Sequence, residues 1–296
     1  MSAIPLRAPD TRRLYGILMV GGGSVLWSTG GLFVRMLDLD LWTMLGWRSL
    51  FAAASLFALL AAEHGRRTPQ AIRAIGWAGL VAAPISAVSM LTYVVAIQAT
   101  SVANVMIVYA TVPLLAAGVA FLWIGERAGR RTLIAAVVAL AGIVVMAGSA
   151  AHGGDLRGNA MAFVMTLTFA ILVVTARRHP ELPMAAVNAF AAVLCGIVSW
   201  PLMQPGVPDA RTLVILAAFG IATTSLAYLL FLIGARHIPS GEAGLLGLLD
   251  TVLAPTWVWL AFGETPAVAT LLGGGIVLGA VVWYLAGGRQ PSTVSP

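Results

Sequence analysis

Two charged residues lie deep inside apolar stretches of the chain, where a charge is costly. At ~1.5 Å per helical residue, Arg48 lies about 10 Å inside the stretch 41–62 and Asp250 about 15 Å inside the stretch 241–262. A charge at that depth usually faces protein or a water-filled cavity. Arg48 is suited to bind a carboxylate, to pair in a gate or to anchor structure by bonding to backbone carbonyls. Asp250 is suited to hold an ammonium group, to take up a proton or to pair with Arg48.

Aromatic and amide side chains in the middle of other apolar stretches add a second kind of chemistry. Aromatic rings suit flat or cationic ligands through stacking and cation–π contact, although helix packing is the commoner reason for any single one. Asn104 would offer neutral hydrogen bonds. The candidate binding residues are Trp27, Arg48, Tyr93, Asn104, Tyr109, Phe169, Tyr228, Asp250 and Trp257.

The chain offers no group suited to catalysis or to metal binding. Its four histidines lie in loops or at the ends of apolar stretches, and no pair of carboxylates lies deep. The single Cys195 allows neither a disulfide framework nor a cysteine metal site. There is no nucleotide-binding motif. We therefore predict neither an enzyme nor a bound metal or cofactor.

Membrane-spanning helices must position these residues. Sixty per cent of the residues are hydrophobic and 9 % are charged, which a soluble chain of this length cannot bury. No loop has room for a soluble domain, and the seventeen basic residues are scattered over short loops, which argues against a nucleic-acid partner. We predict an all-α integral membrane protein with ten transmembrane helices near 14–35, 41–62, 72–98, 102–124, 131–150, 157–177, 184–204, 210–235, 241–262 and 266–287.

The basic residues, all of them arginine, also predict the orientation. If the chain starts inside, thirteen lie in cytoplasmic segments and three, Arg35, Arg157 and Arg211, in outer segments. This bias follows the rule that short cytoplasmic loops are positively charged, so both termini are expected in the cytoplasm. The first apolar stretch lacks a clear cleavage site and is expected to stay as a helix.

The chain also repeats itself. Residues 104–148 end one apolar stretch with Gly125-Glu126 and begin the next with Thr132-Leu133, and residues 242–286 repeat this pattern 138 residues later with Gly263-Glu264. Because each half holds five expected helices, the second must be inverted, which is typical of transporters with a site near mid-membrane. We predict a tail at 1–13, repeats at 14–150 and 157–287, and a tail at 288–296, both tails cytoplasmic.

These features resemble the EamA type of the drug/metabolite transporter superfamily over about residues 14–287. The matching residues are Leu26-Trp27-Ser28-Thr29, Gly46-Trp47-Arg48-Ser49, Tyr93-Val94-Val95-Ala96, Ser101-Val102-Ala103-Asn104, and Pro113 thirteen residues before Glu126. The second half departs from the pattern, since Thr251 stands where Glu-Pro is common and the proline is Pro255. That variant looks most similar to bacterial aromatic amino-acid exporters of the YddG type.

The resemblance implies movement of small metabolites, often export, across the bacterial inner membrane. It also implies that the stretches holding the aromatic candidates line a central cavity. Pro113 and Pro255 are expected to kink or gate their helices. Glu126 and Glu264 are expected to act as helix-end residues beside the following helix N-termini.

The sequence therefore predicts an alternating-access exporter of amino acids, including aromatic ones. An exporter of organic cations, drugs or other metabolites is the alternative, and a membrane receptor or scaffold is a remote one. Proton coupling through Asp250 and simple facilitated flux both stay open. The expected partners are a small-molecule substrate and the lipid bilayer. The protein is expected as a monomer or a weak homodimer, because Gly275 and Gly279 form a GxxxG motif that serves packing within the chain or between copies.

Overall fold

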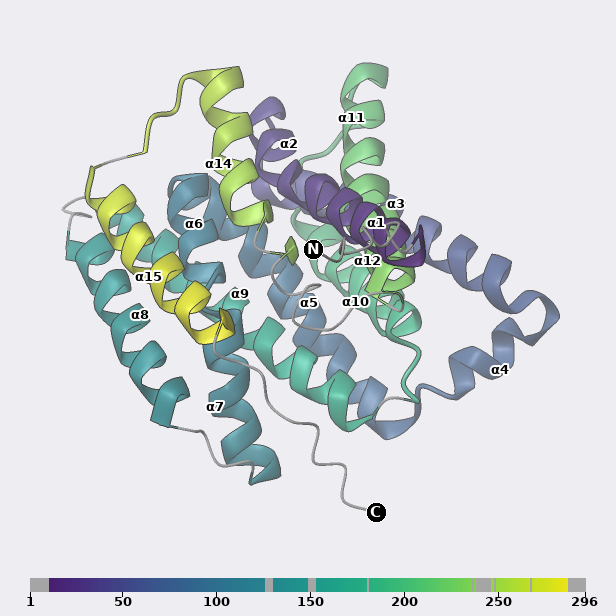
Figure 1. Ribbon diagram of the computed structural model, residues 1–296. Coiled ribbons are helices and arrows are strands. Elements are labelled where there is room, and N and C mark those ends of the chain that lie inside the picture. Colours follow the sequence, from purple (N-terminus) through teal and green to yellow (C-terminus); the bar gives the residue numbers. More distant parts are fainter. Residues whose placement is uncertain are drawn as a thin grey trace, which may run out of the picture.

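The computed structural model describes residues 11–125, 130–148, 153–179, 181–235, 237, 246–247, 249–266 and 268–286, and every secondary-structure element in these ranges is helical (Figure 1). The helices are α1 (Thr11–Ser28), α2 (Gly30–Met36), α3 (Leu41–His64), α4 (Thr68–Arg73), α5 (Gly76–Ala99), α6 (Val102–Tyr109), α7 (Val112–Ile124), α8 (Arg130–Gly148), α9 (Gly153–Arg178), α10 (Met184–Ser199), α11 (Ala210–Gly220), α12 (Ala227–Ala235), α14 (Leu249–Phe262) and α15 (Val268–Ala286). Short turns lie at η1 (Gly65–Arg67), η2 (Trp200–Leu202) and η3 (Ile221–Leu226).

Several of these helices satisfy the requirements for crossing a membrane. In the described residues six helical segments are long and apolar enough, and the bent pair α6–α7 makes a seventh. The helix α14 and the apolar part of α15, Leu271–Ala280, are shorter. The all-helical class is thus confirmed, while the division into ten spans in two inverted halves stays a prediction.

Polar side chains in the loops start several helices by accepting free amide hydrogens. Asp40 Oδ1 accepts from the backbone nitrogens of Trp42 and Thr43 at 3.0 and 3.1 Å, at the start of α3. Ser101 Oγ does the same for Asn104 at 3.2 Å, at the start of α6. Such N-caps satisfy donors that have no partner within the helix, so the polar boundaries of the sequence become helix starts.

The stretches expected as single helices over 14–35 and 102–124 are both broken. The first breaks at Thr29, between α1 and α2. The second breaks after Tyr109, and its two pieces are bent by 42°. Pro113 lies beside this bend, in the first turn of α7, where proline lacks no needed hydrogen bond, so the expected kink is found there. By contrast, α14 continues through Pro255.

The stretch 210–235 changes its winding without stopping. Between α11 and α12, the segment η3 is π-helical, and the amide of Ala227 bonds to the carbonyl of Ala222, five residues earlier. A π-helical turn inserts one extra residue into the helix. The side chains that follow are therefore turned around the helix axis, which periodicity in an apolar stretch does not reveal.

Side-chain contacts define the two ends of the bundle. Arg35 donates hydrogen bonds to Glu264 and to the backbone oxygen of Thr100 at what we call the Glu264 end. At the other end, the Arg178 end, Arg178 donates to the backbone oxygen of Trp123 at 3.4 Å. The helices α5 and α9 run between these ends in opposite directions. The end of α7, before Gly125-Glu126, and the turn at Gly263-Glu264 thus lie at opposite ends; Glu126 itself is outside the described residues.

Two long helices, α8 and α15, pack along each other at the left of Figure 1. They approach closely where a Cβ added at Gly142 would lie 2.7 Å from the carbonyl oxygen of Gly273. The GxxxG motif does not form this contact, since nothing lies within 4 Å of a Cβ added at Gly275 or Gly279. The expected packing of that motif within the chain is therefore wrong.

Candidate binding cavity

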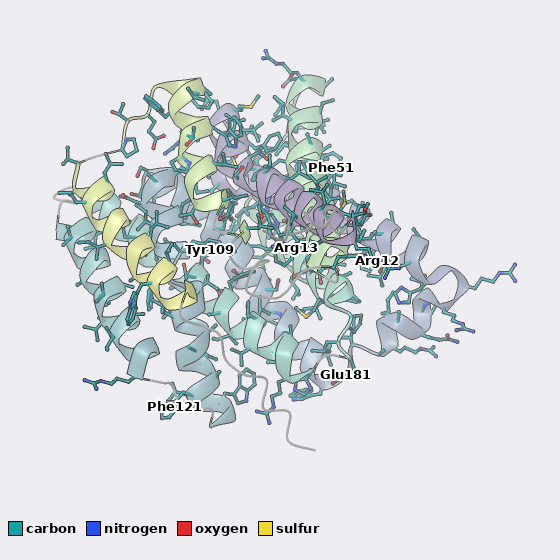
Figure 2. The ribbon with its side chains drawn as sticks, in the orientation of Figure 1. Arg12, Arg13, Phe51, Tyr109, Phe121 and Glu181 are labelled. Atoms are coloured by element: carbon teal, nitrogen blue, oxygen red, sulfur yellow. The ribbon has the colours of Figure 1, made fainter. Side chains whose placement is uncertain are left out.

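A cavity of about 530 Å³ lies among the central helices. Residues of α1, α3, α5, α6, α9, α10, η3, α12 and α14 line it. Figure 2 shows Tyr109, one of the lining residues, among the central helices, whereas Phe121 and Glu181 lie toward the lower end of the view. The lining residues are Trp27, Arg48, Ser86, Ser89, Met90, Tyr93, Met106, Tyr109, Met165, Phe169, Leu172, Val173, Ala176, Met184, Asn188, Thr223, Thr224, Tyr228, Phe231 and Asp250.

Seven of the nine candidate residues lie in this wall, and two do not. Asn104 is buried near the Glu264 end, where its Nδ2 donates to Thr100 Oγ1 at 3.1 Å. Trp257 donates from Nε1 to Ser28 Oγ at 2.9 Å and so ties α14 to α1. Both side chains make contacts between neighbouring segments, and neither belongs to the cavity lining.

Arg48 brings a positive charge to the wall from α3. The residue is 7 % exposed, and its Nη2 donates to Thr224 Oγ1 at 3.5 Å. Its Cζ lies 4.4 Å from the ring centroid of Phe219, a cation–π contact. No backbone carbonyl accepts from it among the described residues, so the alternative of an anchor bonded to carbonyls lacks support.

Asp250 brings a carboxyl group to the wall from α14. It is 7 % exposed, and its Oδ1 accepts from Thr251 Oγ1 at 3.2 Å. No salt bridge joins it to Arg48 in the described structure. Arg48 and Asp250 are thus two polar groups of the cavity wall that are not ion-paired with each other.

Aromatic pairs form much of the remaining wall. The rings of Trp27 and Phe231 have centroids 5.1 Å apart, and those of Tyr109 and Phe169 are 5.5 Å apart. Tyr93 packs closely against the start of α2, next to the break at Thr29. Its hydroxyl group lies so near Gly30 that an added Cβ there would collide with it. The breaks near Thr29 and after Tyr109 therefore lie beside the cavity, as discontinuous helices do around transporter sites.

Several lining residues were not among our candidates. Four are methionines, Met90, Met106, Met165 and Met184, whose flexible thioethers adapt to ligands of varied shape. Asn188 is another, and its Oδ1 accepts from Ser86 Oγ at 2.8 Å. A usable signal did exist on α5, where Ser86, Ser89, Met90 and Tyr93 are spaced on one helical face. Single methionines in apolar helices carry no such signal.

The cavity lining extends toward the Arg178 end, and an aromatic pair packs on the side of the Glu264 end. Ala176 and Met184, at the adjoining ends of α9 and α10, belong to its lining. On the other side, the rings of Phe33 and Phe219 stack with centroids 5.3 Å apart.

Beyond this aromatic layer lies an ion pair. Arg35 Nε is 3.0 Å from Glu264 Oε2, and Arg35 Nη2 donates to Glu264 Oε1 at 3.3 Å and to the oxygen of Thr100 at 3.0 Å. Glu264, which we expected as a helix-end residue before the following helix, thus also pairs with an arginine far away in sequence.

Among the described residues, no group of three or more histidine, cysteine or acidic side chains is arranged to hold a metal ion. The polar atoms of the cavity are hydroxyl groups, an amide, one guanidinium and one carboxylate. This set can bind and orient a small polar molecule.

Comparison with known proteins gives a consistent picture. The protein-family model described as EamA-like transporter family matches residues 14–148 and 156–286. An uncharacterized transporter of Archaeoglobus fulgidus is 24% identical over 274 residues, which cover 90% of this chain and 95% of that protein. A crystal structure with 20% identity superposes with a TM-score of 0.60 and covers 96% of this chain and 100% of that one. At such identity, the structural likeness concerns the fold alone.

Proposed function

Because this chain belongs to the EamA-like transporter family, and is therefore a membrane transporter of small molecules, we propose that it carries amino acids, aromatic ones among them. The substrate binds in the central cavity and leaves the cell by alternating access. The protein sits in the bacterial inner membrane with both termini in the cytoplasm, which places the Arg178 end inside.

The observation that carries this proposal is the combination of charges and rings in one cavity. A free amino acid has a carboxylate and an ammonium group, and the wall offers Arg48 and Asp250 apart from each other. Two aromatic pairs and four methionines surround the space left for a large side chain. A cavity of about 530 Å³ has the size of common small-molecule sites.

The packing of the helices supports alternating access by two related halves. In the proposed repeat, α1, α5 and α7 of the first half correspond to α9, α12 and α14 of the second. The contact of α5 with α9 then has its counterpart in the contact of α12 with α1, and the contact of α7 with α9 has its counterpart in that of α14 with α1. The opposite ends of the Gly-Glu turns fit an inverted arrangement. The cavity extends toward the Arg178 end in this conformation. If each half took up the conformation of the other, the cavity would extend toward the Glu264 end instead.

Counterflow in proteoliposomes tests the proposal. Vesicles that contain the full chain and unlabelled L-phenylalanine or L-tryptophan should accumulate the labelled amino acid, and protein-free vesicles should not. A panel of aliphatic amino acids and organic cations, with and without a pH gradient, separates the substrate classes and reveals proton coupling. Failure to move any amino acid would remove the amino-acid assignment.

An exporter of organic cations is the second candidate, and Asp250 between aromatic rings favours it. The variant Asp250→Asn distinguishes the two. For an amino-acid carrier, it should weaken both amino acids and amines but spare a carboxylate without an amine, such as phenylpropionate. For a cation carrier, transport of cations should fall, and phenylpropionate should not bind at all. The control is Asp38→Asn, which changes an exposed carboxylate.

A further inference from the structure

Arg48 has far fewer hydrogen bonds than a buried guanidinium normally finds. It is 7 % exposed, yet its Nε is buried without a partner. In the described part of the chain, its side chain donates one hydrogen bond, the long 3.5 Å contact to Thr224. A guanidinium carries five N–H donors, so most of its donors are left for a group inside the cavity.

The surroundings hold Arg48 in place without neutralising it. Phe219, which is fully buried, packs its ring against the guanidinium at 4.4 Å. Gly220 brings the backbone of the neighbouring helix against α3, because a Cβ there would lie 2.6 Å from the backbone oxygen of Arg48. A fixed guanidinium loses little conformational freedom on binding, and its planar donors match the two oxygens of a carboxylate.

The π-helical segment η3 supplies the neighbouring hydroxyl group. Thr224 lies within it and lines the cavity together with Thr223. Thr223 Oγ1 donates to the backbone oxygen of Phe219 at 2.7 Å, which leaves Thr224 as the hydroxyl facing Arg48. π-Helical turns occur frequently at functional sites because they change the direction of a few side chains.

Among the residues that the structure describes, no side chain supplies the opposite charge. Both Arg48 and Asp250 are described, and no salt bridge joins them; Asp250 is hydrogen-bonded to Thr251 instead. A buried charge without a counter-ion is strongly unfavourable, and an entering anion would relieve that cost. The site is therefore suited to a small anionic group that comes from the cavity.

We propose that Arg48 and Thr224 form a carboxylate subsite, so that a free carboxylate is a required part of the transported molecule. This inference rests on the proposed function, which it sharpens. The fork of Arg48 binds the two carboxylate oxygens, and the Thr224 hydroxyl adds a further donor. Asp250 holds the ammonium group elsewhere in the cavity. The cavity thereby selects amino acids over amines that have the same ring.

A purely structural Arg48, which only joins α3 to η3, makes a different prediction. Loss of such a residue would weaken every substrate to the same degree. Loss of a carboxylate subsite weakens only molecules that carry the carboxylate. The informative quantity is thus the ratio of affinities for L-phenylalanine and phenethylamine, which share the ring and the ammonium group.

The experiment measures inhibition of counterflow by both compounds in the reconstituted full chain. In the wild type, L-phenylalanine should inhibit about tenfold to hundredfold more strongly than phenethylamine, as expected for a charge-assisted hydrogen-bonded pair. In Arg48→Gln this ratio should approach one. Arg48→Lys keeps the charge without the fork and should give an intermediate ratio. The control Arg211→Gln, at an exposed position, should keep the wild-type ratio.

Thr224→Val provides a second variant that leaves the guanidinium in place, and it should lower the ratio about threefold. It carries the test if Arg48→Gln fails to fold. A wild-type ratio in either folded variant, or an equal loss for both compounds, would overturn the subsite. Equal inhibition by both compounds in the wild type would also overturn it while leaving amino-acid transport intact. If neither compound is bound or moved, the proposed function itself fails.

Discussion

At the scale of single residues, the lone charges were the most informative part of the sequence. Arg48 and Asp250 were identifiable because a charge within an apolar stretch needs a physical reason, and both line the cavity. Asn104 and Trp257 were candidates as well, but neither lines the cavity. Depth along a helix follows from counting residues, whereas rotation does not when every face of the helix is apolar.

The aromatic wall leads to a prediction about substrate preference. Phe169 packs against Tyr109 with centroids 5.5 Å apart and lines the cavity. Phe169→Leu removes the ring, and the affinity for aromatic amino acids should fall about two- to tenfold while aliphatic ones change little. Competitive counterflow measures both. Phe163→Leu, an exposed position on the same helix, is the control; equal losses for aromatic and aliphatic substrates would contradict the prediction.

At the scale of elements, three expected spans depart from a regular α-helix, and each departure lies beside the cavity. Pro113 indicated the break after Tyr109 in the sequence, and the adjacent residues Gly30 and Gly31 come directly after the break at Thr29. Nothing in the sequence signalled η3. It includes the position 138 residues after Pro84, which lies inside the continuous helix α5 at the matching place in the first half. Both halves thus weaken helical hydrogen bonding at that depth by different means.

The ion pair at the Glu264 end gives a prediction about closure. Arg35 and Glu264 join α2 to the segment after α14, with side chains 28% and 29% exposed. Glu264→Gln removes the pair, and labelling of a cysteine placed at buried Leu37 should become about two- to fivefold faster in detergent, since such pairs contribute up to ~1 kcal/mol. Background labelling is removed with Cys195→Ala.

Two further variants make this test specific. Glu181→Gln removes the partner of His179, 3.1 Å away in the loop between α9 and α10, and should leave labelling unchanged. The double change Arg35→Glu with Glu264→Arg restores opposite charges and should slow labelling again. Unchanged labelling in Glu264→Gln would show that the ion pair has no part in closure.

The contact between α8 and α15 gives a stability prediction. Gly142→Ala places a Cβ 2.7 Å from the carbonyl oxygen of Gly273, so the two helices must move apart and lose packing. The melting temperature in detergent should fall by several degrees. Gly275→Ala is the matched control on α15, since its Cβ would meet nothing within 4 Å. Equal melting temperatures for the two variants would count against this contact.

At the scale of the whole molecule, the proposed inverted halves predict where two turns are exposed. Cysteines at Glu126 and Thr265, introduced one at a time into Cys195→Ala, should be labelled by an impermeant maleimide from opposite sides of the membrane. Intact cells should expose only Thr265→Cys, and permeabilised cells should expose both. Labelling of both from the same side would exclude the inverted arrangement and the alternating-access proposal with it.

The sequence by itself determined the all-helical membrane class, the transporter family and the depth of the charged and aromatic residues, because hydropathy, motif spacing and residue counting depend only on the order of the chain. Only the tertiary structure decided which faces of the helices meet. It joined Arg35 to Glu264 across 229 residues, left Arg48 without an ionic partner among the described residues, and turned Trp257 out of the cavity. These outcomes depend on helix rotation and on the breaks in the helices, which packing settles when apolar side chains cover every face.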